Sequence, residues 1–277
     1  MRLRSLLFVP GDRPERIEKA LGLEADALIL DLEDAVAPTR KDAAREAVAA
    51  ALAIPRTVPL FVRVNPLDSD LIADDIAALS GAKPDGLVLP KAEGAASVAA
   101  LAARLALPVL PVATETPFAL FQLGSYREVA ANLIGLTWGA EDLPAAIGSV
   151  SRADDGRYTQ PFEMVRSLAL FGAHAAGVPA IETIFPDFRD DAGLAAYAAR
   201  GRRDGFTGMM AIHPAQVAII NAAFTPSDAE IAQACAVVDL FAAHPGAGVL
   251  QLDGRMVDAP HLKAAQALLA RAGYPGP

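Results

Sequence analysis

Short apolar, β-branched runs recur along this chain, and each is followed by a polar cluster and then by an alanine-rich stretch with a helical pattern. This alternation is typical of parallel sheets built from βα units. Most runs begin roughly 25 residues apart, about the length of one unit in a barrel. Eight runs can be identified: Ser5–Val9, Ala27–Leu30, Leu60–Val64, Gly86–Leu89, Pro108–Val112, Leu133–Thr137, Pro179–Thr183 and Gly208–Ile212. The pattern predicts an α/β fold, a (β/α)8 TIM barrel.

The interval between the sixth and seventh runs is longer than the others. It contains an insertion, Leu143–Thr159, with a polar, glycine-containing centre. We expect a long polar loop here, lying over the mouth of the barrel.

After the eighth run the pattern changes, so we predict two parts: a barrel domain, residues 1–224, and a C-terminal extension, residues 225–277. The extension shows a helical segment, Asp228–His244, an apparent hairpin through Val249–Val257 and a short final helix. We expect the extension to cover the active site of a neighbouring subunit, which makes the protein a homo-oligomer.

Composition limits the functional classes. With 277 residues, 53% of them hydrophobic, the chain can bury one large core. Its formal net charge of −9 disfavours nucleic acid as a partner. The apolar run Leu6–Val9 is cut short by Pro10, so it predicts a strand and neither a signal peptide nor a membrane span. The single cysteine, Cys235, cannot form an internal disulfide, and we expect a cytoplasmic protein.

Charged residues gather at the predicted strand ends, where barrel enzymes place their reactive groups. Six carboxylates face two cations there, and burying such an excess without a counter-ion is unfavourable. The groups are Asp31, Glu33, Asp34, Arg63, Lys91, Glu115, Glu141 and Asp142. Glu115 and Asp142 end adjacent strands and are the best pair to bind one Mg²⁺, or Mn²⁺. The alternative is a structural network in which both carboxylates pair with Arg63 and Lys91.

Other chemistries are disfavoured. The histidines have no zinc-binding spacing, and the chain lacks a dinucleotide fingerprint, a P-loop and a G-x-S-x-G motif. His213, at the end of the eighth strand, is the histidine best placed to contact substrate, although a structural role is the alternative.

The first βα loop opens a helix on which Arg13, Arg16 and Lys19 share one face. Together with the helix N-terminus, these cations are candidates to bind a phosphate-bearing substrate such as coenzyme A. The alternative is an ordinary solvated face that also includes Glu15 and Glu18.

Several ordered motifs then resemble one family. They are Leu7-Phe8-Val9-Pro10-Gly11 with Arg13-Pro14-Glu15-Arg16, Leu30-Asp31-Leu32-Glu33-Asp34, Arg63-Val64-Asn65, Leu89-Pro90-Lys91, Glu115-Thr116, Trp138-Gly139-Ala140-Glu141-Asp142-Leu143, Ile212-His213-Pro214 and Gly254-Arg255-Met256-Val257-Asp258. Their types, order and spacing resemble the CitE-like branch of the HpcH/HpaI aldolase and citrate lyase β-subunit family, which includes malyl-CoA, β-methylmalyl-CoA and citramalyl-CoA lyases.

The resemblance implies a Mg²⁺-dependent carbon–carbon lyase that interconverts a 3-hydroxyacyl-CoA with an acyl-CoA and a 2-oxo acid. Glu115 and Asp142 would be the metal ligands, and Arg63 would stabilise charge on the thioester enolate or aldol oxygen. Asp258 resembles an acid–base residue supplied by a neighbouring subunit, although a turn aspartate is the alternative. We expect a trimer or hexamer.

The same resemblance gives supporting roles to other residues. Glu33, Asp34 and Lys91 would orient Arg63 and the metal ligands, although a Schiff base on Lys91 is an alternative. Gly139 and Ala140, with Glu115 and His213, would contact the substrate, and Arg13, Arg16 and Lys19 would contact coenzyme A.

Three alternative functions remain open from the sequence. The chain is alternatively a citrate lyase β subunit that acts on the citryl thioester of a carrier protein, or a thioesterase in which water captures the same thioester. The third alternative is a non-enzymatic function, in which the barrel has lost catalysis and serves as a scaffold.

Overall fold

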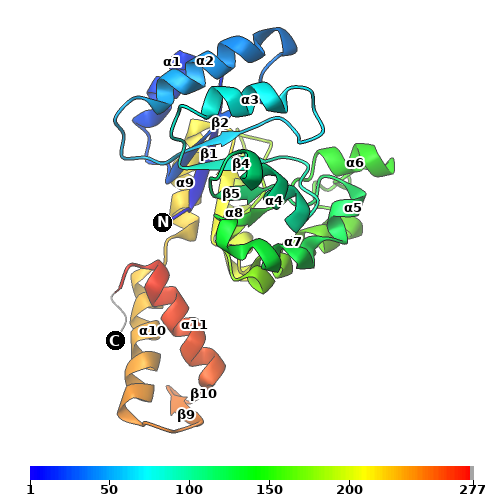
Figure 1. Cartoon of the computed structure of the whole chain (residues 1–277). Coiled ribbons are helices and arrows are strands. Elements are labelled where there is room, and N and C mark those ends of the chain that lie inside the picture. The colour runs from blue at the N-terminus through cyan, green and yellow to red at the C-terminus, as the bar shows by residue number, and fades with distance from the viewer. Residues whose placement is uncertain (275–277) are drawn as a thin grey trace. The chain divides into compact units, whose positions relative to one another are not determined.

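The computed structural model describes residues 1–274, which form two compact units. The first comprises Leu3–Ala222 and the second begins at Ala223. Both units are drawn in Figure 1.

The first unit is built on eight strands, all of which pair in parallel. The strands are β1 Ser5–Pro10, β2 Ala27–Asp31, β3 Leu60–Arg63, β4 Gly86–Leu89, β5 Val109–Pro111, β6 Leu136–Thr137, β7 Ala180–Glu182 and β8 Gly208–Ala211. Their order runs β5-β4-β3-β2-β1-β8-β7-β6. Bridges from Val109 to Leu133 and from Val112 to Thr137 join the two end strands. The predicted barrel is therefore confirmed, and each predicted strand lies within about three residues of an observed one.

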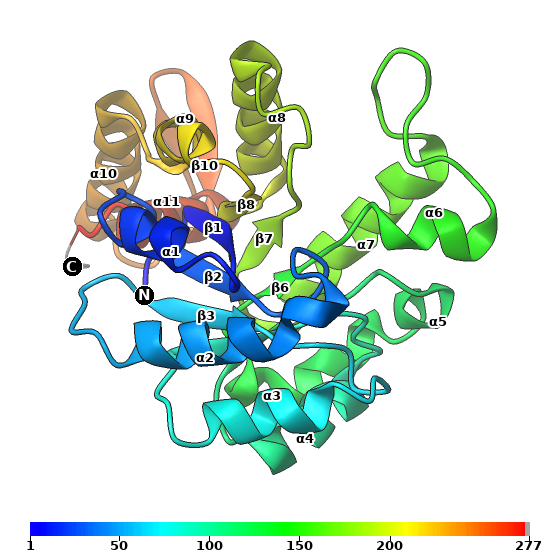
Figure 2. The same ribbon diagram turned by 90° about the horizontal axis from the view of Figure 1, so that it is seen from above.

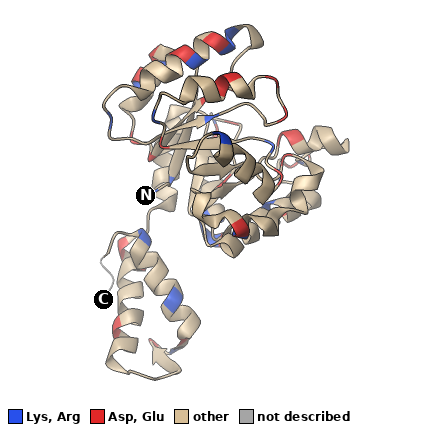
Figure 3. Ribbon diagram, viewed as in Figure 1, with Lys and Arg blue, Asp and Glu red and all other residues tan. Residues whose placement is uncertain are grey.

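Helices connect the strands and lie outside them (Figure 2). They are α1 Pro14–Leu21, α2 Lys41–Leu52, α3 Ile72–Leu79, α4 Ala95–Arg104, α5 Pro117–Leu120, α6 Asp142–Ile147, α7 Gln160–Ala176, α8 Asp191–Asp204 and α9 Pro214–Phe224, with 3-10 segments η1 Pro38–Arg40 and η2 Leu123–Asn132. In Figure 3 blue and red segments are mixed along α2, whereas the strands are mostly tan. No helix among residues 1–274 is both long and apolar enough to cross a membrane.

Alternate strand residues fill the inside of the barrel. Ile29, Phe61, Val88, Leu110 and Ile181 belong to one buried apolar cluster. Because side chains alternate along a strand, the residues two positions beyond Ile29 and Phe61 continue the same inward face at the carboxyl end of the barrel. The polar residues at these positions therefore face one shared mouth.

The insertion after β6 differs from the predicted polar loop. Its first part is α6, which ends at Gly148 in the left-handed conformation, φ 66°. The sequence favoured a loop because of the polar, glycine-containing centre of the insertion, but the short helix ends before that centre, and Pro144 is tolerated in its first turn. The remaining loop extends outward from the strands in Figure 2, so the expectation that it lies over the mouth was wrong.

The second unit contains α10 Asp228–Ala243, a hairpin of β9 Val249–Leu252 and β10 Arg255–Asp258, and α11 Ala259–Arg271. Ser227 and Glu230 form a capping box at the start of α10. Asp253 and Gly254 both have positive φ, 50° and 76°, as a two-residue hairpin turn requires. Apolar side chains of both helices pack with Val257 into a small core.

Candidate active site

Arg63 is clamped by a carboxylate from the neighbouring strand. Asp31, at the end of β2, accepts hydrogen bonds from Arg63 Nε over 2.7 Å and from Nη2 over 2.6 Å. This bidentate pairing fixes the plane of the guanidinium. Asp31 is fully buried and also accepts the backbone N–H groups of Glu33 and Ala35. The position of Arg63 is therefore set by the turn that follows β2.

Glu33 lies between two cations. Its Oε2 is 3.0 Å from Arg63 Nη1, and its Oε1 accepts a hydrogen bond of 3.0 Å from Lys91 Nζ. Burial raises the pKa of Glu33, while the charges of Arg63 and Lys91 oppose that rise. Burial alone would lower the pKa of Arg63, but its bonds to Asp31 raise it above the ordinary value. Arg63 is a fixed positive charge at the mouth, with its guanidinium 4.8 Å from the centre of the Phe8 ring.

Lys91 joins the arginine side of the site to the predicted metal ligands. Its Nζ lies 3.0 Å from Glu33 Oε1 and 3.3 Å from Asp142 Oδ1. Burial would lower the pKa of Lys91, but the bond to Glu33 and the charges of Glu33 and Asp142 raise it well above the usual range. A Schiff-base lysine needs the opposite shift, because its neutral amine is the nucleophile. The arrangement favours an orienting role for Lys91.

The backbone of Lys91 is also unusual, since φ is 50° in a residue other than glycine. In this conformation the Lys91 N–H donates a 2.5 Å hydrogen bond to Glu115 Oε2. Left-handed backbone at a side-chain cluster is a form of local strain often found at functional sites.

Glu115 is 7% exposed and lies against Gly139. A Cβ at position 139 would stand 2.8 Å from Glu115 Cγ and 3.0 Å from its Oε1, so only glycine leaves room for this carboxylate. The Thr114 hydroxyl bonds both the N–H and the carbonyl of Gly139, each over 3.1 Å. Ala140 is buried beside them, and Asp142 follows at the first position of α6.

The donor set fits a divalent cation. Burial raises the pKa of Glu115 to about 8, against the Lys91 hydrogen bond, and the charge of Asp142 adds to the rise. Within residues 1–274, no Lys or Arg side chain pairs with Glu115. Asp31, Glu33 and Asp142 form ion pairs with Arg63 and Lys91, whereas the described residues offer Glu115 no ion-pair partner. A bound Mg²⁺ would supply a positive charge beside Glu115.

The number of protein ligands suits magnesium as well. Among the described residues, no group of three or more His, Cys, Asp or Glu side chains could hold a metal. Mg²⁺ usually takes one or two carboxylates and leaves its other positions to water and substrate. Glu115 and Asp142 would supply such a pair.

His213 follows β8 and has contacts of its own. Its ring stacks on Phe188, with centroids 4.9 Å apart, and its Nδ1 accepts the backbone N–H of Ala215 over 3.2 Å. That bond satisfies a free N–H at the start of α9, so the ring has a structural role. Contact of His213 with substrate stays a prediction.

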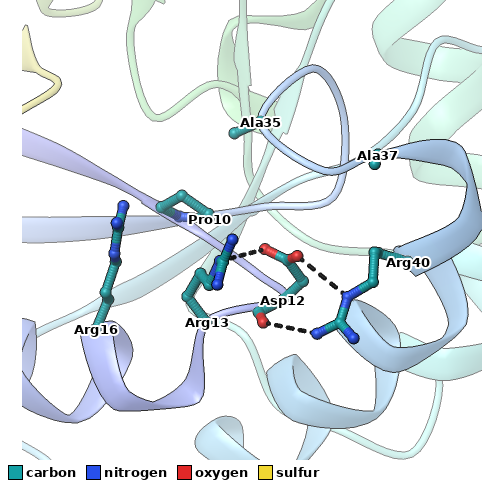
Figure 4. Close-up of a pocket in the computed structure, with 7 residues that line it drawn as sticks. All are labelled: Pro10, Asp12, Arg13, Arg16, Ala35, Ala37 and Arg40. Atoms are coloured by element: carbon teal, nitrogen blue, oxygen red, sulfur yellow. Dashed lines mark hydrogen bonds and ion pairs between the residues drawn. The ribbon is translucent and has the colours of Figure 1, made fainter.

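Arg13 and Arg16 line a pocket of about 520 Å³ beside α1 (Figure 4). Arg40, from η1, lines the same pocket and was not foreseen from the sequence. Asp12 lies between two of these cations, 3.7 Å from Arg13 Nε and 3.4 Å from Arg40 Nε. Three guanidinium groups line this pocket, and such groups suit phosphate oxygens. Lys19 is exposed and does not line this pocket.

Asp258 ends β10, and its Oδ1 lies 2.5 Å from His261 Nδ1. The hydrogen bond from His261 lowers the pKa of this carboxyl, which favours its ionised form. Its side chain is 30% exposed, so it is accessible.

The sequence model of the HpcH/HpaI aldolase/citrate lyase family matches residues 4–214 of this chain. The chain belongs to this family. The match covers all eight strands of the barrel, so the resemblance seen in the motifs is confirmed.

Relatives in the HpcH/HpaI family that match nearly the whole chain carry different names. A (3S)-malyl-CoA thioesterase of Cereibacter sphaeroides is 38% identical over 97% of this chain and 94% of its own length. A citrate lyase subunit beta-like protein of Mycobacterium tuberculosis is 40% identical over 96% and 94%. Among solved structures, CitE of M. tuberculosis in complex with magnesium, acetoacetate and coenzyme A has a TM-score of 0.85 at 35% identity, covering 98% of each chain.

The sequence gives no distinct signal for the roles of two residues of this HpcH/HpaI site. Asp31 appeared among the strand-end carboxylates, yet nothing marked it over Glu33 or Asp34 as the partner of Arg63. The available signal was its position two residues after Ile29, which places both side chains on the inward face of β2. Arg40 comes from a segment without periodicity, and only the fold brings it to Asp12. Asp34 is exposed, and its predicted orienting role stays a prediction.

Proposed function

We propose that this chain is a Mg²⁺-dependent carbon–carbon lyase that interconverts a 3-hydroxyacyl-CoA, such as malyl-CoA or citramalyl-CoA, with an acyl-CoA and a 2-oxo acid. The observation that supports it best is the pair of buried Glu115 and half-buried Asp142, both bonded by Lys91. Lys91 is linked through Glu33 to the arginine that Asp31 clamps. One mouth of the barrel thus offers a cation site beside a fixed positive charge.

Glu115 and Asp142 would hold the metal, and Mn²⁺ suits the same oxygen ligands. When bound, Mg²⁺ would draw electron density from the oxygens of the hydroxy or oxo acid. Lys91 bonds Glu115 through its backbone N–H and pairs with Glu33 and Asp142 through its ammonium group. The small residues Gly139 and Ala140, with His213, are the proposed neighbours of the acid portion of the substrate.

Arg63 would stabilise the charge that develops on the thioester oxygen. In cleavage, a base takes the proton of the 3-hydroxyl and the C2–C3 bond breaks. The electron pair of that bond forms the thioester enolate, which then takes a proton at C2 to give the acyl-CoA. The Asp31 bonds use two of the five N–H groups of Arg63, so donors remain for the enolate oxygen.

Asp258 of a neighbouring subunit is the proposed base. Its carboxylate pairs with His261 and is partly exposed, so it is accessible to a hydroxyl group of the substrate. This assignment requires a homo-oligomer, for which we propose a trimer or hexamer in which the C-terminal extension reaches the next barrel.

Coenzyme A is the proposed carrier of the acyl group. Arg13, Arg16 and Arg40 would bind its phosphates in the pocket beside α1, with Lys19 near the rim. The CitE structure bound to coenzyme A supports a thioester of this kind.

Thioester hydrolysis is the second candidate function. It is favoured by the similarity to a (3S)-malyl-CoA thioesterase along nearly the whole chain. In hydrolysis, water adds to the thioester carbonyl and the C–S bond breaks, which releases free coenzyme A and the hydroxy diacid. Arg63 would stabilise the same oxygen in both reactions, so the site alone accommodates either outcome.

A citrate lyase β subunit is a third candidate, supported by 32% identity to such subunits of Haemophilus influenzae and Escherichia coli. Such a subunit would act on a citryl thioester of a carrier protein. A scaffold without catalysis would have no need for the clamped Arg63 beside the buried Glu115.

The test is a product analysis of (3S)-malyl-CoA incubated with the purified protein and Mg²⁺, followed by chromatography of the thioesters. Acetyl-CoA and glyoxylate in equal amounts identify the lyase, whereas free coenzyme A and malate identify the thioesterase. Citramalyl-CoA and β-methylmalyl-CoA are assayed in parallel, and citryl-carrier protein tests the third candidate. Glu115→Gln should remove turnover. Absence of any product from protein that binds Mg²⁺ would refute the proposal.

A further inference from the structure

Glu182 is a fully buried carboxylate that the proposed chemistry does not use. It is the last residue of β7 and has no exposed surface. Its neighbour Ile181 faces the inside of the barrel, so Glu182 points outward, between the strands and the helices. A buried charge in this layer requires partners.

One partner neutralises it. Arg166 of α7 places Nε 2.7 Å and Nη2 2.6 Å from Glu182 Oε2. Its Nη1 also pairs with Asp204 over 2.6 Å. Arg166 therefore neutralises the charge of Glu182 through contacts with Oε2 alone. Oε1 remains available to accept hydrogen bonds from other donors.

Glu182 Oε1 accepts three hydrogen bonds. The donors are Trp138 Nε1 at 2.5 Å, the Tyr197 hydroxyl at 2.9 Å and the Thr183 backbone N–H at 3.0 Å. Trp138 is fully buried, so its indole N–H depends on this acceptor. The bond determines the orientation of the ring.

The other side of the Trp138 ring is fixed by aromatic packing. Tyr158 meets it edge to face, with centroids 5.2 Å apart and planes at 62°. The Arg152 guanidinium lies 4.2 Å from the Tyr158 ring centre and bonds its hydroxyl. The ring is thus held between a hydrogen bond and a packed neighbour.

Trp138 begins the segment that bears the proposed metal ligands. Gly139 follows it and contacts Glu115, and Asp142 lies three residues beyond that glycine. Because a Cβ at position 139 would already stand 2.8 Å from Glu115 Cγ, a small displacement of this backbone changes the space around Glu115.

We propose that Glu182 is a positioning residue for the metal site and acts through the Trp138 indole N–H on the segment from Gly139 to Asp142. The inference rests on the proposed Mg²⁺-dependent function. It identifies a carboxylate that would touch neither metal nor substrate but sets the affinity of the site.

The chain provides its own reporter, since Trp138 is its single tryptophan. Intrinsic fluorescence at the indole absorption edge therefore reports this one ring. If the ring is coupled to the metal-binding segment, Mg²⁺ should change the emission with the same midpoint as binding measured by calorimetry.

The experiment is a double-mutant cycle of Glu182→Gln and Trp138→Phe, with the Mg²⁺ Kd measured by calorimetry on the full chain. Supporting partners of metal ligands typically change affinity 10- to 100-fold, so each single variant should raise Kd by about tenfold or more. Both variants disturb one linkage, so the double variant should resemble either single one. Asp85→Asn, which removes a carboxylate paired with Arg56 and unconnected with Glu182, should leave Kd unchanged.

Unchanged Kd in a folded Glu182→Gln or Trp138→Phe protein would overturn the inference, as would additive effects in the double variant. Should Glu182→Gln fail to fold, Trp138→Phe alone decides, because it removes the donor and keeps the aromatic packing. Absence of Mg²⁺ binding by the wild-type protein would refute the proposed function and this inference together. Wild-type binding that both variants leave unchanged would refute this inference alone.

Discussion

The backbone N–H of Lys91 donates a 2.5 Å hydrogen bond to Glu115 Oε2, although the left-handed backbone at Lys91 is unfavourable for a residue with a side chain. The same residue extends its ammonium group to Asp142. Lys91 therefore contacts both proposed metal ligands, one through its backbone and one through its side chain. The positive charge of Lys91 lowers the pKa of Glu115, which favours loss of its proton when a cation binds.

Mg²⁺ binding should depend on pH through Glu115, whose pKa is raised by burial to about 8. Below that pH the carboxyl is protonated in the metal-free protein, so the cation must displace the proton. The affinity should rise with pH up to about 8 and then level off, with close to one proton released per ion near pH 7. Calorimetry in two buffers of different ionisation enthalpy measures the proton. A pH-independent Kd would contradict this expectation.

The same shift predicts the direction of a stability change. The folded pKa of Glu115 lies above its ordinary value of 4.5. Its contribution to stability is therefore present below about pH 4.5 and is lost as pH rises through about 8. Bound Mg²⁺ compensates that loss, so the increase in Tm on adding Mg²⁺ should be larger at pH 8 than at pH 6. In Glu115→Gln the two increases should be equal.

Gly139→Ala should weaken the metal site, because the added Cβ meets Glu115 Cγ at 2.8 Å and Val112 Cγ1 at 3.2 Å. Displacing one carboxylate ligand should raise the Mg²⁺ Kd by at least about tenfold. Gly124→Ala is the matched control, since its Cβ would meet nothing within 4 Å. Equal affinity of the two variants would show that Glu115 is not a ligand.

Asp31→Asn should leave Arg63 without its clamp, since an amide cannot accept both guanidinium bonds. A guanidinium displaced by about 1 Å should lower kcat roughly 100-fold, with a smaller change in KM. Asp85→Asn, at the opposite end of the barrel strands, removes another arginine-paired carboxylate and should keep kcat. Steady-state kinetics with the preferred thioester measure both.

The barrel was predictable because every strand coincides with an apolar run in the sequence. Parallel strands in a barrel bring all their carboxyl ends to one mouth. Arg63, Lys91, Glu115 and Asp142 come together for that reason alone. Side-chain partnership was not predictable. Asp31, Glu33 and Asp34 are equivalent as sequence, and burial and bond geometry select the first as the clamp.

Local backbone features were also hidden. The positive φ of Lys91 has no composition signal, because glycine is the residue that usually marks it. Glu182 ends a strand like the others, but it points away from the mouth, and its bond to Trp138 joins residues 44 positions apart. Interactions of this range depend on helix placement outside the barrel.

The arginine pocket should determine thioester binding more than turnover. Arg13→Gln, Arg16→Gln and Arg40→Gln should each raise KM for the CoA thioester, and added salt should reduce the difference from wild type. kcat should stay nearly constant, because the proposed contacts of these groups are with the carrier and not with the reacting carbons. Arg104→Gln, an exposed arginine at the end of α4, is the control. Unchanged KM in all three pocket variants would place coenzyme A elsewhere.

A site shared between subunits should show trans complementation. Arg63→Ala and Asp258→Ala chains should each be inactive as pure oligomers. In a mixed oligomer, a site is intact when its barrel comes from an Asp258→Ala chain and its neighbour's extension comes from an Arg63→Ala chain. For equal amounts and random exchange in a closed ring, about one quarter of sites meet both conditions, so about a quarter of wild-type activity should return.

The control separates sharing from simple stabilisation. Arg63 and Glu115 belong to the same barrel mouth, so mixing Arg63→Ala with Glu115→Ala chains should restore nothing, whatever the extent of exchange. Exchange itself is followed by co-purification of differently tagged chains. If exchanged Arg63→Ala and Asp258→Ala chains stay inactive, Asp258 does not serve a neighbouring site. If the control pair recovers activity, mixing acts through folding and the quarter recovered in the test pair loses its meaning.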